Sequence, residues 1–227
     1  MATTKTQRWG ILAILIVTVI GTVGSFAVMI LASENQANDS AKQQQAYDEY
    51  QKRSQEYQQK VTAQADELSV QYHETFAPYA DNVIEFDSAS VTSLTTNDIV
   101  IGEGEEISGS TPFAAYYVGW NPKGKVFDSS IDTDKSKLKA PLFANVSLDK
   151  GLDNATLITG WKEGMKGMRV GGIREITIPS DKAYGEQGQG DDIPPNTPLK
   201  FIVMAISAPA VIEQPSIPAE LYQGMTR

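Results

Sequence analysis

The chain has 227 residues, of which 41% are hydrophobic and 21% are charged, as in an ordinary globular protein. Its 19 basic and 28 acidic side chains give a net charge of −9, which argues against nucleic acid as a partner because phosphates attract clustered lysine and arginine. There is no cysteine, and His73 is the only histidine, so disulfides, thiol nucleophiles, histidine triads and cysteine-ligated zinc are excluded. We therefore expect no metal and no cofactor.

Residues 9–33 form an uncharged, mostly apolar run. The run is longer than the roughly 20 residues that cross a bilayer as a helix. Lys5 and Arg8 precede it and Glu34 follows it, so the positive-inside rule predicts a single-pass signal-anchor. Residues 1–8 would then be cytoplasmic and the rest of the chain extracytoplasmic. A cleaved signal peptide is the alternative, although its apolar region would normally be only about 7–15 residues long.

Residues 34–78 are polar and rich in glutamine, glutamate, lysine and alanine. Neither proline nor glycine occurs before Pro78, and larger side chains recur at spacings of three, four and seven, which predicts a helix over residues 41–76. The members of this stripe are Tyr47, Tyr50, Tyr57, Val61, Ala65, Leu68, Tyr72 and Phe76. Two interpretations remain open: a helical stalk with weak self-association as a coiled coil, or a partly ordered linker.

Residues 83–208 alternate short runs of valine, isoleucine, phenylalanine and tyrosine with glycine, proline and aspartate, which indicates strands joined by turns. The expected strands are residues 91–94, 99–101, 113–120, 126–128, 143–148, 172–178 and 199–206. A short helix is expected at residues 157–165, and residues 209–227, with three prolines, read as an extended tail. The pattern predicts an α+β fold, an antiparallel β-sheet covered on one face by the short helix and preceded by a transmembrane helix and a helical stalk.

Three blocks follow one another inside this β-rich region. YYVGWNPKGKVFDSSID (116–132) has an aromatic strand, a turn and Phe-Asp-Ser-Ser; LITGWKEGMKGMRVGG (157–172) has the short helix and a turn. IREITIPSDKAYGEQGQGDDIPPNTPLKFIVMAI (173–206) has an Ala-Tyr-Gly loop, Ile-Pro-Pro and a last strand. In this order the blocks resemble the FK506-binding-protein (FKBP) class of peptidyl-prolyl cis–trans isomerases. The resemblance implies that class's fold, an antiparallel β-sheet wrapped around one short helix, and its activity.

The composition suits that chemistry. Rotation about an X–Pro bond faces a barrier of about 18–20 kcal/mol because amide resonance is lost in the twisted form. An apolar pocket that excludes water and fits the twisted amide lowers the barrier without a nucleophile or a metal. Such a site needs aromatic side chains and a few hydrogen-bonding groups, all of which the three blocks contain.

The resemblance implies a catalytic set of Phe127, Asp128, Trp161 and Tyr184. Trp161 would form the floor that receives the proline ring, Asp128 would face the reacting peptide, and the Tyr184 hydroxyl would bind a substrate carbonyl. The implied substrate-binding residues are Tyr117, Leu157, Ile158, Ile193 and Phe201, with the Ile158 N–H holding a second carbonyl. Proline-containing polypeptides are the implied clients, and FK506-like macrolides are implied ligands.

Some positions depart from the family pattern. Thr133 stands where many relatives have an arginine that pairs with the pocket aspartate, so Asp128 would lack that partner unless Lys135 or Lys137 substitutes for it. The segment between the first two blocks is longer than in the smallest relatives, and Leu142, Phe143 and Ala144 compete for one wall of the pocket. Gln189 and Asp192 replace residues that contact bulky ligands in some relatives. These departures leave a second interpretation open, a proline-peptide-binding or chaperone module with little catalysis.

Overall fold

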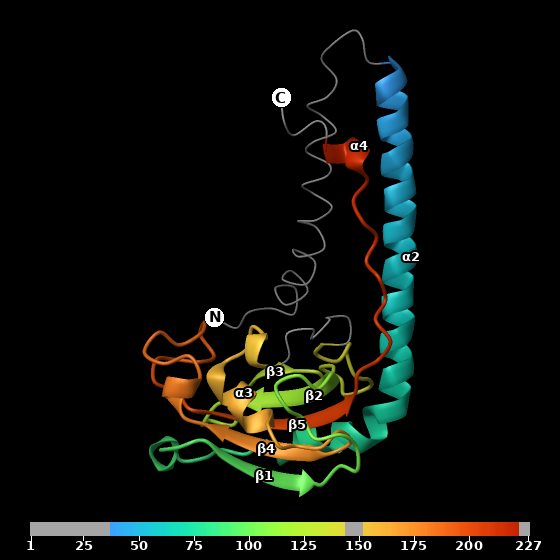
Figure 1. The fold of residues 1–227 in the computed structure, drawn as a ribbon. Helices are drawn as coiled ribbons and strands as arrows, with labels where there is room; N and C mark the ends of the chain where they lie inside the picture. Colours follow the sequence, from blue (N-terminus) through green and yellow to red (C-terminus); the bar gives the residue numbers. More distant parts are fainter. Residues whose placement is uncertain (1–36, 144–151, 223–227) are drawn as a thin grey trace. The chain divides into compact units, whose positions relative to one another are not determined.

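The computed structural model describes residues 37–143 and 152–222 (Figure 1). Its main elements in chain order are α2 (Ala37–Phe76), β1 (Thr95–Val100), β2 (Phe113–Trp120), β3 (Val126–Ser129), α3 (Thr159–Met165), β4 (Ile173–Ile178), β5 (Leu199–Ser207) and α4 (Ala219–Tyr222). One compact unit, Gln58–Glu213, contains all five of these strands and α3. Of the described residues, 37–57 and 214–222 belong to the other unit.

The long helix expected at residues 41–76 is present as α2, which begins at Ala37. The expected anchor at residues 9–33 lies outside the described residues. No helix within residues 37–143 and 152–222 combines the length and the apolar character that a bilayer-crossing helix requires. The expected extended tail contains the short helix α4.

The five strands form one sheet in the order β1-β4-β5-β2-β3, and every neighbouring pair is antiparallel. The antiparallel sheet with one short helix is therefore confirmed. The strands expected at residues 113–120, 126–128, 172–178 and 199–206 correspond to β2, β3, β4 and β5 with ends that differ by at most one residue. The longest pairing runs along β2 and β5, from Phe113 opposite Ser207 to Trp120 opposite Lys200.

The first strand differs from the sequence prediction. Residues 91–94 are not a strand, and β1 occupies Thr95–Val100, so the expected strand at residues 99–101 covers only its end. All six residues of β1 are exposed because it is an edge strand paired only with β4. Phe143 lies in a turn, and the rest of the strand expected at residues 143–148 falls outside the described residues.

Side chains of β2 alternate between the two faces of the sheet, as the period of two in a strand requires. Phe113 and Ala115 join a core cluster with Trp161 of α3, and we call this side the α3 face. Ala114 and Tyr116 join a second cluster on the opposite side, the α2 face. One strand thus supplies both halves of the hydrophobic core.

Two glycines let α3 lie close against β4 (Figure 1). A Cβ atom at Gly160 would lie 2.2 Å from a methyl carbon of Ile178, and one at Gly164 would lie 2.6 Å from a methyl carbon of Ile176. Any larger residue at these positions would push the helix off the strand. The close packing fixes the helix that carries Trp161.

Arg174 of β4 secures the other end of α3. Its buried guanidinium donates to the carbonyls of Gly164 and Lys166 at 2.9 and 3.0 Å, which are acceptors at the C-terminal end of the helix. The same group forms a bidentate ion pair with Asp98 of β1 at 2.6 and 2.9 Å. One side chain therefore joins β1, β4 and α3.

The last turns of α2 pack on the α2 face of the sheet. Phe76 is fully buried there, with Leu68 and Tyr72 packed against the same cluster. The Ser69 hydroxyl accepts a hydrogen bond from the Leu138 N–H at 2.8 Å, and an imidazole nitrogen of His73 lies 2.8 Å from the Lys135 carbonyl. The end of the helix therefore belongs to the core, a role that the polar sequence pattern did not indicate.

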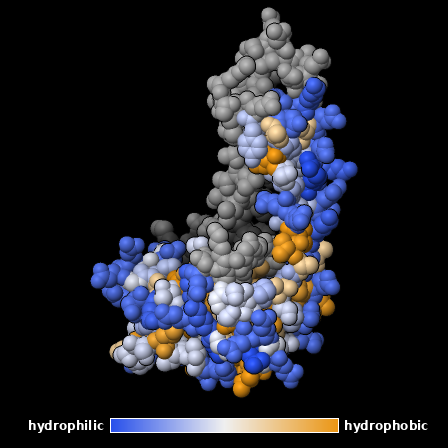
Figure 2. Space-filling model, in the orientation of Figure 1, coloured by the Kyte–Doolittle hydropathy of each residue, from blue (hydrophilic) through white to orange (hydrophobic). Residues whose placement is uncertain are grey.

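The face of the molecule drawn in Figure 2 is mostly hydrophilic, with small separate apolar areas. Ile99, Val100 and Ile101 at the end of β1 are among the large apolar side chains exposed to solvent, and Ile101 is 77% exposed. The two clusters on either side of the sheet bury most of the other large apolar residues of the strands.

Candidate active site

Four aromatic side chains meet on the α3 face. The Trp161 ring packs edge-to-face against Tyr117 of β2 and Phe201 of β5, with ring centroids 5.5 and 5.7 Å apart. Phe201 makes the same kind of contact with Phe127 of β3 at 5.5 Å. Edge-to-face packing is the favoured arrangement because ring edges carry positive and ring faces negative partial charge. The structure thus brings together four residues that the resemblance assigned to one pocket.

The remaining apolar site residues surround this group. Trp161, Ile193 and Phe201 are at most 5% exposed and belong to the core cluster of the α3 face. The half-buried residues packed against that cluster include Tyr117, Phe127, Leu157, Ile158 and Tyr184. The site is therefore an apolar surface formed by three strands, α3 and the loop after β4.

Asp128 is held at the rim of this surface by Tyr117. The Tyr117 hydroxyl donates to one carboxylate oxygen at 2.6 Å, and the Ser129 N–H donates to the other at 2.8 Å. Burial raises the pKa of Tyr117, and the charge of Asp128 raises it further, so the phenol stays protonated as a donor. Neither lysine takes the place of that arginine, because Lys135 pairs with Asp81 at 2.5 Å and Lys137 lies 3.8 Å from Asp66.

Two hydrogen-bond donors next to the aromatic group have no protein acceptor among residues 37–143 and 152–222. One is the hydroxyl of Tyr184, whose pKa is raised by burial and then by the charge of Asp128. The other is the N–H of Ile158, the residue that precedes α3 and whose carbonyl accepts from Trp161 and Lys162. Both are donors on an apolar surface, where a hydrogen bond to a bound carbonyl is shielded from water.

Leu142 and Phe143, two of the three candidates for one side of the site, differ in their positions in the structure. The Phe143 ring packs edge-to-face on Phe113 at 5.6 Å and so joins the α3 face. Leu142 pairs with Ala115 through two backbone hydrogen bonds of 2.8 and 3.0 Å and thus lies alongside β2. Ala144 lies outside the described residues.

Gly119 of β2 is a site residue that the sequence analysis did not single out. A Cβ atom there would lie 2.5 Å from a ring carbon of Phe201 and 2.9 Å from the Phe127 ring. The absence of a side chain at Gly119 therefore permits these two rings to meet. A glycine inside a strand is the available sequence signal, because it often marks a close approach of other groups.

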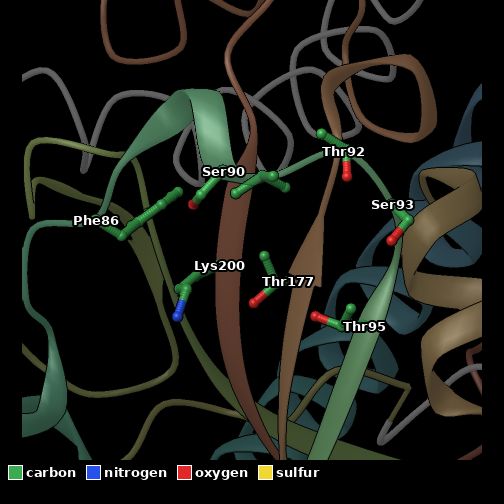
Figure 3. A pocket seen from close by; sticks show the side chains of 8 residues that line it. Phe86, Ser90, Thr92, Ser93, Thr95, Thr177 and Lys200 are labelled. Atoms are coloured by element: carbon green, nitrogen blue, oxygen red, sulfur yellow. The ribbon is translucent and has the colours of Figure 1, made fainter.

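A separate hollow with a volume of about 210 Å³ lies away from this site (Figure 3). It is lined by Phe86, Ser90, Val91, Thr92, Ser93, Thr95, Thr177 and Lys200. Thr177 and Lys200 are paired neighbours on β4 and β5, and both alternate with residues of the α3 face, so they project on the opposite side. The Lys200 ammonium is paired with Glu175 at 2.8 Å. None of the lining residues belongs to the aromatic group.

The geometry on the α3 face suits one kind of chemistry. It offers an aromatic floor for an apolar ring, two donors for peptide carbonyls and one carboxylate, and it uses no cysteine or histidine nucleophile. An apolar surface with a few placed polar groups has the chemistry needed for a small apolar ring flanked by amides. The class that the fold and the site define is an FKBP-type isomerase.

Comparisons with known proteins agree with this class. The family model described as FKBP-type peptidyl-prolyl cis-trans isomerase matches residues 104–206. The FK506-binding protein of Neisseria meningitidis serogroup A is 37% identical over 111 residues, which cover 49% of this chain and 92% of that protein. The probable FK506-binding protein of Corynebacterium glutamicum is 39% identical over 116 residues, which cover 51% of this chain and 86% of that protein.

The chain belongs to the FKBP-type peptidyl-prolyl cis–trans isomerase family. Among solved structures, the crystal structure of AtFKBP13 is similar to this chain. The alignment has 32% sequence identity, covers 51% of this chain and 92% of that chain, and has a TM-score of 0.41.

Proposed function

We propose that this isomerase accelerates X–Pro rotation in polypeptides that fold on the outer side of the cytoplasmic membrane. The uncharged run at residues 9–33 would be its single-pass anchor, and Lys5 and Arg8 before that run support a cytoplasmic N-terminus. The observation that carries the catalytic part is the edge-to-face aromatic group around Trp161, with Asp128 held at its rim by Tyr117.

Each site residue has a proposed role. The proline ring rests on Trp161 between the walls formed by the other aromatic and aliphatic residues. The Tyr184 hydroxyl and the Ile158 N–H donate to carbonyls on either side of the proline, a role supported by their lack of an acceptor among the described residues. Asp128 faces the twisted amide. Because the twisted amide is less polar at its oxygen than the planar form, a water-poor surface favours it and lowers the barrier.

A protease-coupled assay with a proline-containing peptide tests the catalytic part, using the full chain in non-ionic micelles. Trp161→Ala should lower kcat/KM by about 30-fold or more because it removes the aromatic floor. Tyr184→Phe should lower it by about 3- to 10-fold because it removes one hydrogen bond. A folded chain that gives only the uncatalysed rate would refute the catalytic part. FK506-like macrolides are proposed ligands of the same surface and should inhibit competitively.

The location is tested separately. In intact right-side-out membrane vesicles, an added protease should reach residues 83–208, and carbonate extraction should leave the chain in the membrane fraction. Digestion only after the vesicles are opened would place the domain on the cytoplasmic side and contradict the proposed orientation.

One observation favours the second candidate, a binding module with little catalysis. Thr133 replaces the arginine of many relatives, and Tyr117 is the only side chain among the described residues that hydrogen-bonds to Asp128. If the module binds without catalysing, peptide affinity and protection of an unfolded client should persist in a chain whose isomerase rate equals the background.

A further inference from the structure

The turn between β2 and β3 is built around the side chain of Asn121, which is 5% exposed. Its side-chain oxygen accepts the N–H groups of Lys123 and Lys125 at 3.0 and 3.2 Å. Because the oxygen already faces two donors, the amide nitrogen must be the atom that points the other way. That nitrogen donates to the backbone carbonyl of Asp192 at 2.8 Å, 71 positions along the chain.

Lys125 adds a second link to the same residue. Its ammonium forms an ion pair with the Asp192 carboxylate, with the lysine side chain 56% and the aspartate side chain 28% exposed. An exposed ion pair contributes little by itself. The buried hydrogen bond from Asn121 is therefore the stronger link, and Lys125 supports it from the solvent side.

Asp192 belongs to the loop that carries Tyr184 and Ile193. Backbone hydrogen bonds close this loop on itself: Gly188 donates to Tyr184, Gln189 to Ile193 and Asn196 to Gly185, at 3.2, 2.7 and 2.8 Å. Ile193, the residue next to Asp192, is 3% exposed and packs in the cluster of the α3 face. A restraint at Asp192 is thus transmitted through short backbone connections to Tyr184.

Asn121, the donor of the hydrogen bond to Asp192, lies in the turn that precedes β3. The turn that Asn121 organises enters β3, which carries Phe127 and Asp128. Tyr184 and Phe127 pack against the same core cluster of the α3 face, and the charge of Asp128 raises the pKa of Tyr184. The Asn121–Asp192 hydrogen bond therefore joins the strand that bears Asp128 to the loop that bears Tyr184.

We infer that Asn121 is a positioning residue of the isomerase: with support from Lys125, it holds the loop of residues 184–196 so that the Tyr184 hydroxyl keeps its place opposite Asp128 and Phe127. This inference rests on the role proposed above for Tyr184. Asn121, a residue of the turn and not of the aromatic group, would thereby control the hydrogen bond that the Tyr184 hydroxyl donates to the substrate.

Asn121→Asp is the sharp test. Aspartate keeps an oxygen for the two turn N–H groups but replaces the donor with an acceptor facing the Asp192 carbonyl, so the turn is retained and the link is lost. Asn97→Asp is the matched control, because it makes the same chemical change at an exposed position of β1, at the far edge of the sheet from β3. The assay measures kcat/KM for a proline-containing peptide with the full chain. Each substitution is measured alone and in combination with Tyr184→Phe.

We expect Asn121→Asp to lower kcat/KM by about 5-fold and to reduce the additional effect of Tyr184→Phe to less than half of its value in the unaltered chain. Asn97→Asp should leave kcat/KM unchanged and the effect of Tyr184→Phe undiminished. Loss of stability alone would not produce this coupling, because the two substitutions would then act independently on the folded fraction. An unchanged Tyr184→Phe effect in the Asn121→Asp chain overturns the inference.

Lys125 supplies a second test if Asn121→Asp does not fold. Lys125→Met changes a solvent-exposed side chain and should lower kcat/KM by about 2-fold, with Lys125→Arg restoring it. If Lys125→Met changes neither kcat/KM nor the Tyr184→Phe effect, the inference is wrong. Failure of the proposed function is a different result: Tyr184→Phe would then have no effect in the unaltered chain either.

Discussion

Replacing Phe76 with alanine should destabilise the isomerase domain although Phe76 precedes the region that the family model matches, residues 104–206. The Phe76 ring is fully buried and lies 6.1 Å from the ring of Tyr116 and 6.2 Å from that of Tyr79. Truncation of a fully buried phenylalanine costs about 3–5 kcal/mol, because the lost transfer free energy adds to the cost of the cavity. For a unit of this size, each kcal/mol corresponds to roughly 2–4 °C in Tm.

Urea unfolding of the full chain in non-ionic micelles, followed by tryptophan fluorescence, measures the effect. Trp120 and Trp161 are buried on opposite faces of the sheet and report on both core clusters. Val70→Ala is the matched control, because Val70 lies on the same helix but is 84% exposed, and its replacement should change the free energy of unfolding by no more than about 0.5 kcal/mol. Equal unfolding midpoints for Phe76→Ala and Val70→Ala would refute the assignment of the last turns of α2 to the core.

Three further substitutions have defined outcomes. Tyr116→Phe should raise the free energy of unfolding by about 1 kcal/mol, because the buried Tyr116 hydroxyl has no hydrogen-bond partner among the described residues; urea titration measures this. Gly119→Ala should lower kcat/KM by about 10-fold and stability by about 1–3 kcal/mol, because the new methyl group would displace Phe201. The hydrogen bond from Arg174, with its charge, holds the pKa of Asp98 below its ordinary value, so the ion pair stabilises the fold at neutral pH. That contribution is complete above the unfolded-state pKa of about 4 and is lost as the pH falls through the lower folded-state pKa. The stability difference between the unaltered chain and Asp98→Asn, measured by urea unfolding, should therefore shrink as the pH is lowered below about 4.

Each of these expectations has a contrary result. A less stable Tyr116→Phe chain would mean that the hydroxyl makes a favourable interaction. Normal kcat/KM in Gly119→Ala would show that the contact between Phe201 and Phe127 is not needed for activity. A stability difference between the unaltered chain and Asp98→Asn that stays constant between pH 7 and pH 3 would show that folding does not lower the pKa of Asp98.

The sequence predicted the centre of the fold well because its strands are buried on both faces. β2 reads as a continuous run of aliphatic and aromatic residues, and seven of its eight side-chain positions are buried. β1 was misplaced for the opposite reason. Its residues, Thr-Thr-Asn-Asp-Ile-Val, are all exposed on an edge strand, so neither alternation nor an apolar run marks them, and only the pairing with β4 defines the strand.

The candidate site was predictable where it followed local motifs and not where it depended on distant contacts. Phe127, Trp161 and Tyr184 stand in short recognisable blocks, and the fold gathers them on one side of the sheet. The link from Asn121 to Asp192 joins positions 71 apart, and the sequence shows only that Asn121 suits a turn. The ion pair between Lys135 and Asp81 likewise joins positions 54 apart, and no motif near Asp128 indicates it.

The alternation along β2 has a consequence for how this chain tolerates insertions and deletions. Removing a single residue before Tyr116 would shift every later side chain of the strand to the other surface, placing Tyr117 on the α2 face and its neighbour Tyr116 on the α3 face. Catalysis and helix docking would fail together, so the strand has no freedom to change length.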